Sequence, residues 1–132
     1  MDANELVIRT LYDARARRDW SGVGAVLAED VCWHEPGDGD HSGHFRGREV
    51  VVSILQKYVD VTESTFQLEP EAFLNLTEHS AVTVRWWAER DGRRSEGREI
   101  AVYHLRGGTI DNVWFYNEPS DTEALLAVFA FD

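Results

Sequence analysis

Hydrophobic positions in the first half of the chain recur at three- and four-residue intervals, which is the spacing of an amphipathic helix. This spacing predicts helices over residues 3–18, 21–28 and 49–59. Asp2, followed by Glu5 three residues later, has the pattern of a capping box at the start of the first helix. The first half of the chain is therefore expected to be mainly helical.

In the second half the spacing becomes two, which is typical of strands with one buried face. The predicted extended segments are, in chain order, 65–76, 81–89, 97–106 and 110–117. Asp91-Gly92 and Gly107-Gly108 are two-residue hairpin sequences between three of them. These turns predict an antiparallel arrangement of the late strands.

Two further elements frame this pattern. Residues 31–35 read as a short strand that ends at Pro36, and the Gly- and Asp-rich residues 37–44 predict a loop. A second capping box, with Ser120 as its first residue, precedes a predicted closing helix over residues 124–129.

Helices that precede an antiparallel sheet indicate an α+β fold rather than a doubly wound one. The late strands carry large aromatic residues on both faces, which is more than one buried face requires. A curled sheet would explain this, with its concave face on the helices around a pocket and its convex face against a second subunit. We find no internal repeat or linker, so residues 1–132 are expected to form a single domain.

Composition narrows the classes of partner. The net charge of −11 opposes contact with nucleic acid and with anionic membranes. Cys32 is the only cysteine, which excludes an intrachain disulfide and fits a reducing compartment. The longest apolar run, residues 124–131, is too short to span a membrane, and the acidic N-terminus lacks the features of a signal peptide. The expected location is the cytoplasm.

Several short segments resemble the SnoaL-like branch of the nuclear transport factor 2-like superfamily. They are LYDA at 11–14, RD at 18–19, LAEDVCWHEP at 27–36, FRGRE at 45–49, AERDGR at 88–93 and HLRGGTI at 104–110. The resemblance implies N-terminal helices packed on a strongly curved antiparallel sheet that forms a cone with an apolar cavity. It also implies a small hydrophobic ligand, no cofactor, and a homodimer formed through the sheet. Relatives include ketosteroid isomerases, epoxide hydrolases, dehydratases and polyketide cyclases.

Glu35 and His34 are the candidate catalytic residues. The resemblance puts Glu35-Pro36 where ketosteroid isomerases carry their proton-shuttling acid, and a carboxylate in an apolar cavity is a competent base near neutral pH. Alternation along a strand puts Glu35 on the same face as Trp33 and His34 on the other. A bulge after Trp33 would reverse this and give the role to His34.

The resemblance also suggests a set of substrate-binding residues: Tyr12, Trp33, Glu99, Ala101, Tyr103, Phe115 and Asn117. Tyr12 could instead pack in the core, and Asn117 can orient a ligand but cannot act as a base. Ala101 stands where the isomerases place an acid that stabilises the oxyanion, and a methyl group cannot donate that hydrogen bond. The epoxide hydrolases that the sequence resembles use an arginine flanked by two aspartates. The late strands carry no such arginine on one face, so the resemblance does not favour epoxide hydrolysis here.

His41 and His44 lie with several acids in one short loop and have the ligand types of a metal site, but their spacing matches no metal signature. Neither a phosphate-binding loop nor a nucleophile elbow is present in the sequence. Two hypotheses therefore remain open. The protein is a cofactor-free isomerase, cyclase or lyase that uses Glu35 or His34 for proton transfer, or it is a non-catalytic ligand-binding or dimeric assembly module.

Overall fold

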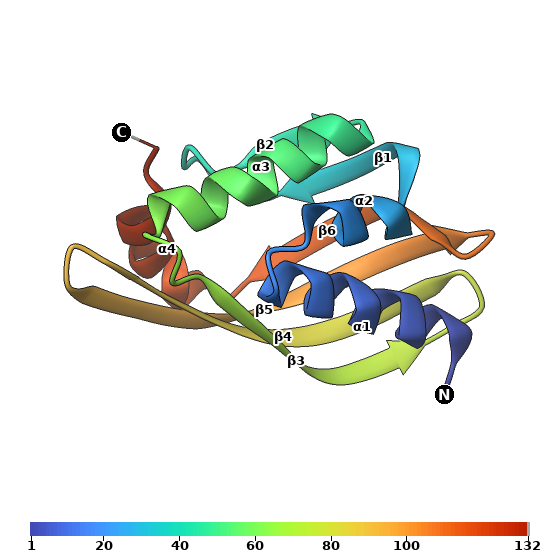
Figure 1. The fold of residues 1–132 in the computed structure, drawn as a ribbon. Coiled ribbons are helices and arrows are strands. Elements are labelled where there is room, and N and C mark those ends of the chain that lie inside the picture. The colour runs from blue at the N-terminus through green and yellow to red at the C-terminus, as the bar shows by residue number, and fades with distance from the viewer. Residues whose placement is uncertain (132) are drawn as a thin grey trace.

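The computed structural model describes residues 1–131 (Figure 1). The elements are, in chain order, α1 (Ala3–Ala16), α2 (Trp20–Val26), β1 (Leu27–Glu35), β2 (Gly43–Arg46), α3 (Arg48–Val61), β3 (Gln67–Asn75), β4 (His79–Arg90), β5 (Arg93–Arg106), β6 (Thr109–Asn117), the 3-10 helix η1 (Pro119–Asp121) and α4 (Thr122–Phe129). The predicted α+β class, with N-terminal helices and a short C-terminal helix, is confirmed.

The strands form one curved sheet in the order β2-β1-β6-β5-β4-β3. Figure 1 shows α1, α2 and α3 over one face of this sheet, with α4 at one end below the C-terminal part of α3. The expectation of a purely antiparallel sheet was wrong for one pair, because β1 and β6 run parallel. A parallel pair needs a long crossover connection, and α3 with the strands that follow it supplies one. Hydrophobic spacing predicts strands but carries no information about their relative direction.

Helix α1 forms where the sequence predicts it and ends two residues earlier. The Asp2 carboxylate accepts hydrogen bonds from the backbone N–H groups of Asn4 and Glu5, which caps the helix. The buried face of α1 carries Ile8, Leu11, Tyr12, Ala14 and Arg15. This face is apolar except at Arg15, whose charged side chain is therefore directed into the molecule.

Helix α4 begins differently from the prediction. Its N-cap residue is Asp121 rather than Ser120, and η1 precedes it. The Asp121 carboxylate accepts a hydrogen bond from the backbone N–H of Arg98 on β5, 3.0 Å away. The Asp121 side chain therefore makes a tertiary contact and gives no hydrogen bond that caps the helix.

The loop after β1 is shorter than predicted, because residues 43–46 form the edge strand β2 against β1. The late hairpins agree with the sequence. Asp91 and Gly92 both have positive φ, as do Gly107 and Gly108, which is the backbone conformation that tight hairpins require. Within residues 1–131, no helix combines the length and the apolar composition that a membrane crossing requires.

Candidate functional site

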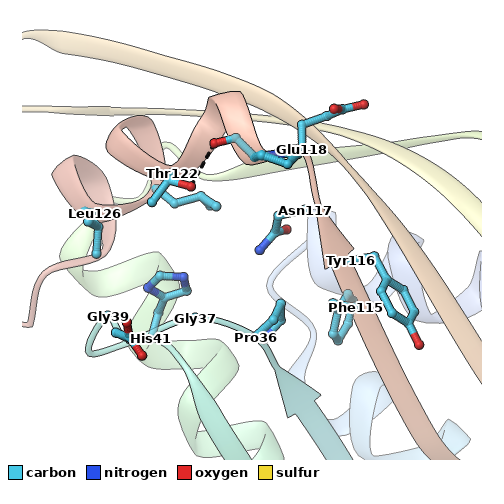
Figure 2. Close-up of a pocket in the computed structure, with 13 residues that line it drawn as sticks. Pro36, Gly37, Gly39, His41, Phe115, Tyr116, Asn117, Glu118, Thr122 and Leu126 are labelled. Carbon is cyan, nitrogen blue, oxygen red and sulfur yellow. Dashed lines mark hydrogen bonds between the residues drawn. The ribbon is translucent and has the colours of Figure 1, made fainter.

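The concave side of the sheet encloses a small inner cavity of about 30 Å³. Its walls come from the helices, the strands and the loop after β1: Arg15, Glu35, His41, Tyr58, Phe66, Leu68, Trp86, Glu99, Phe115, Asn117, Leu125 and Phe129. An outer pocket of about 320 Å³ lies next to it. Figure 2 shows this outer pocket between the loop after β1, the end of β6 and α4, with His41 and Asn117 pointing into it.

The two compartments share four lining residues, which are His41, Phe115, Asn117 and Leu125. The outer pocket opens to solvent, whereas the inner cavity has room for about one or two water molecules. The shared residues therefore form the partition through which the inner cavity would communicate with solvent.

Glu35 and Glu99 bring two carboxyl groups into the inner cavity. Burial raises the pKa of Glu35 to about 7, although the Trp33 indole N–H, which donates to Glu35 Oε1 at 3.0 Å, and the Arg15 charge favour ionisation. Burial, together with the charge of Glu35, raises the pKa of Glu99 to about 8. At neutral pH the two carboxyl groups thus keep at least one proton between them, so the pair can both accept and donate a proton, as base and acid catalysis require.

Arg15 supplies the positive charge of this cavity. It is only 6% exposed, and its guanidinium lies 5.8 Å from the ring centroid of Trp33 and 5.9 Å from that of Phe66. The positive charge of the guanidinium offsets the charge of one ionised carboxylate. With one carboxyl group of the pair ionised, the site as a whole is close to neutral.

Four of the residues proposed from the sequence as substrate-binding lie behind the cavity wall instead. Trp33 and Ala101 are fully buried in the core. The Tyr103 hydroxyl donates to the Tyr12 hydroxyl at 2.6 Å, and burial raises the pKa of both phenols, so both stay neutral. Glu99, together with Phe115 and Asn117, does line the cavity. Strand alternation correctly predicted which side chains lie on the concave face of the sheet. It did not predict how far each of them lies from the cavity.

His34 lies on the opposite face of the sheet from Glu35. Its Nδ1 is 2.6 Å from Nδ1 of His44 on β2, and its ring stacks on Trp114. Strand β1 keeps its alternation at this point, since no bulge separates Trp33 from Glu35 in its pairing with β2. Of the two catalytic candidates, only Glu35 has its side chain in the cavity.

The histidines of the loop after β1 are also separated. His41 is buried against Phe129 and Tyr58, whereas His44 is exposed on the outer face of the sheet. Among residues 1–131 no group of three or more histidines, cysteines and acids is arranged to hold a metal ion.

Sequence reasoning did not place Arg15, Trp86 or Phe129 in the site, and it considered His41 only as part of a metal-binding loop. Arg15 had a usable signal, because it lies four residues after Leu11 on the apolar face of α1. The other three had none, since Trp86 belongs to a regular strand alternation and a loop histidine or terminal phenylalanine is placed only by the tertiary fold.

Residues 8–113 match the family model of the SnoaL-like domain. The chain belongs to the SnoaL-like family. The SnoaL-like protein is 30% identical over 128 residues to the uncharacterized protein Rv0034 of Mycobacterium tuberculosis, covering 96% of this chain and 98% of that relative.

Solved structures support the same fold. The protein Bal32a, from a soil-derived mobile gene cassette, is similar with a TM-score of 0.86 and 24% identity, covering 96% of both chains. A nuclear transport factor 2-like protein from Burkholderia pseudomallei has a TM-score of 0.80 and 24% identity, covering 96% of this chain and 98% of the other. A protein of Xanthomonas campestris pv. campestris assigned as a polyketide cyclase has a TM-score of 0.74 and 18% identity, covering 97% of each chain.

Proposed function

We propose that this SnoaL-like protein binds a small hydrophobic carbonyl compound inside its curved sheet. It then moves a proton from one atom of that compound to another without a cofactor, and so acts as an isomerase, cyclase or lyase. The observation that carries the proposal is the carboxyl pair of Glu35 and Glu99 beside Arg15 in the inner cavity. Burial holds the pKa of Glu35 at about 7, where a carboxylate is strong enough as a base and still ionised in part.

In the proposed reaction Glu35 removes a proton from the carbon next to the carbonyl group, and the electron pair of the broken C–H bond moves to the carbonyl oxygen. Glu99, which burial keeps protonated, donates a hydrogen bond to the developing enolate. Return of the proton from Glu35 to another carbon completes an isomerisation. Glu99 thus supplies the donor that the methyl group of Ala101 cannot supply.

Hydrogen–deuterium exchange tests this proposal without knowledge of the natural substrate. A panel of neutral ketones, including 1-indanone, 2-decalone and cyclohexenone, is incubated with the protein in D₂O, and exchange next to the carbonyl is followed by NMR. We expect catalysed exchange with at least one ketone. Glu35→Gln keeps the shape of the side chain but removes the base, so exchange should fall by 100-fold or more, the order expected for loss of a general base.

His34→Asn is the matched control, because His34 is the neighbour of Glu35 on the outer face of the sheet. Its exchange rate should equal that of the unchanged protein. Equal exchange by Glu35→Gln and the unchanged protein would reject Glu35 as the base, and loss of exchange in His34→Asn alone would give the role to His34.

The second candidate function, a non-catalytic binding or assembly module, is favoured by the size of the inner cavity. At about 30 Å³ it has no room for an organic ring, because the Phe129 ring of α4 fills the space between Tyr58, Phe66 and Trp86. A thermal-shift screen with steroids, terpenoid epoxides, polyketide fragments and aromatic acids separates the two. A ligand at 100 times its Kd adds about 2.7 kcal/mol to the stability, so binding without exchange would support the module.

A further inference from the structure

Two buried polar atoms that the proposed reaction does not use lie in residues of the inner cavity. Trp86 Nε1 and His41 Nδ1 have no hydrogen-bond partner within the protein, and their residues are 1% and 6% exposed. Buried polar groups are nearly always paired, and leaving one unpaired costs free energy. Both residues line the inner cavity, and His41 also lines the outer pocket.

The ring of Phe129 lies beside the rings of these two residues. Its centroid lies 4.9 Å from that of Phe66, 5.5 Å from Tyr58, 5.4 Å from His41 and 6.0 Å from Trp86. One benzene ring is thus surrounded by four aromatic rings, two of which carry the unpaired nitrogens. A phenylalanine fills the apolar part of this position but offers no polar atom to either nitrogen.

We propose that the position of the Phe129 ring is the ring-binding subsite of the ligand, and that Trp86 Nε1 and His41 Nδ1 recognise an oxygen on that ring. The proposal deepens the function proposed above, because it states which part of the ligand lies away from the carboxyl pair.

The chemistry of the two nitrogens defines the class of ligand. An indole N–H only donates, so the atom facing Trp86 must be an acceptor, and a hydroxyl or carbonyl oxygen fits. His41 can either donate or accept through Nδ1, depending on its tautomer. Because the charge of Arg15 already offsets that of one carboxylate, a neutral ligand leaves the net charge of the site near zero. Phenols, quinones and cyclic enones meet these conditions, whereas unsubstituted hydrocarbons leave the nitrogens unpaired.

Entry of such a ring requires Phe129 to leave, since the cavity beside it holds only about 30 Å³. Phe129 is the last residue of α4, a helix of 8 residues at the open end of the cone. The outer pocket is also bordered by α4, through Thr122, Leu125 and Leu126, and it shares four lining residues with the inner cavity. Displacement of this short helix would join the two compartments.

Benzene and phenol are matched probes, because they differ by one oxygen and fit the space that Phe129→Ala opens. A cavity left by a truncated core side chain can bind benzene. We expect Phe129→Ala to bind both probes, measured by NMR titration, at least 10-fold more tightly than the unchanged protein does. Adding Trp86→Phe, which keeps a ring but removes the N–H, should weaken phenol binding by about 3- to 10-fold and benzene binding by less than 2-fold.

Phe131→Ala is the control, because Phe131 lies on the same segment but packs against Lys57 outside the ring subsite. It should not raise the affinity for benzene. The proposal is overturned if Phe129→Ala gains no more affinity for the probes than Phe131→Ala does. It is also overturned if Trp86→Phe leaves the ratio of the benzene and phenol affinities unchanged, because water alone would then satisfy the indole N–H. Phe129→Leu replaces Phe129→Ala if the latter does not fold.

This experiment measures binding and requires no turnover. If Glu35→Gln keeps full exchange activity while the phenol preference disappears with Trp86→Phe, only the proposed reaction fails. If the exchange is lost in Glu35→Gln while Trp86→Phe has no effect on phenol, only the ring subsite fails.

Discussion

Two carboxyl groups in one small cavity make the stability of this protein depend on pH. Glu35 and Glu99 have pKa values raised to about 7 and about 8 in the folded protein. In the unfolded chain both groups return to the ordinary range of glutamate. Between these values the folded protein holds protons that the unfolded chain has released, so stability is highest below the unfolded pKa and falls as pH rises through the folded pKa.

Glu99→Gln tests this dependence, because glutamine keeps the size of the side chain but cannot ionise. We expect the Tm of the unchanged protein to fall steadily from about pH 5 to pH 8, and the Tm of the variant to fall by less over the same range. At pH 8 the variant should be more stable by on the order of 1–3 kcal/mol, as pKa shifts of this direction imply. Thermal unfolding at a series of pH values measures it.

The control is Glu89→Gln, a change at an exposed glutamate on β4. Its Tm should follow that of the unchanged protein across the series. A Glu99→Gln protein whose Tm falls with pH as steeply as that of the unchanged protein would show that Glu99 does not hold its proton in the fold.

At the scale of elements, the packing of α4 against β5 depends on one glycine in that strand. A Cβ on Gly97 of β5 would lie 2.4 Å from Asp121 Oδ2 and 2.8 Å from Trp86 Cζ2. Both distances are shorter than real contacts allow, so the absence of a side chain is what lets Asp121 bind the Arg98 N–H. The same glycine gives the Trp86 ring its place beside the cavity.

Gly97→Ala and Gly24→Ala form a matched pair of glycine replacements in regular elements. A Cβ on Gly24, in α2, would have its nearest contact at 3.6 Å, which is ordinary. Gly24→Ala should therefore stabilise the protein by about 0.5–1 kcal/mol through helix propensity. Gly97→Ala should destabilise it by about 1–3 kcal/mol, the cost of overpacking, and should speed hydrogen exchange in α4. Denaturant unfolding measures the free energy of unfolding of both variants. Equal changes in the two variants would contradict the packing argument.

At the scale of the whole molecule, we propose that two copies pair through the outer face of the sheet. Ile100 and Tyr116 are direct cross-strand neighbours on this face and are 44% and 59% exposed. Val102 and Trp114, the next pair on the same face, are partly buried. Such a contiguous apolar face is typical of a surface that contacts another protein.

Sedimentation at micromolar concentration tests the pairing. The unchanged protein should sediment as a dimer, and Ile100→Glu should shift it to a species of 15.1 kDa, because it puts a charge at the centre of the face. Leu6→Glu, on the exposed side of α1, should leave the dimer intact. A 15.1 kDa species for the unchanged protein would reject the dimer.

The sequence by itself determined the order and type of most elements, since hydrophobic spacing and turn residues act locally. It also put Glu35 on the concave face and His34 on the other face, because strand alternation is a short-range property. Arg15 was readable in the same way, as the charged residue on an apolar helical face.

Only the tertiary structure decided which side chains meet. It brought Glu99 to Glu35 from strands far apart in the sequence, set Tyr12 and Tyr103 behind the cavity wall, and placed Phe129 between the helices and the sheet. The physical reason is that depth along a cone depends on sheet curvature and on which strands neighbour each other. Both arise from packing across the whole molecule, which local spacing does not record.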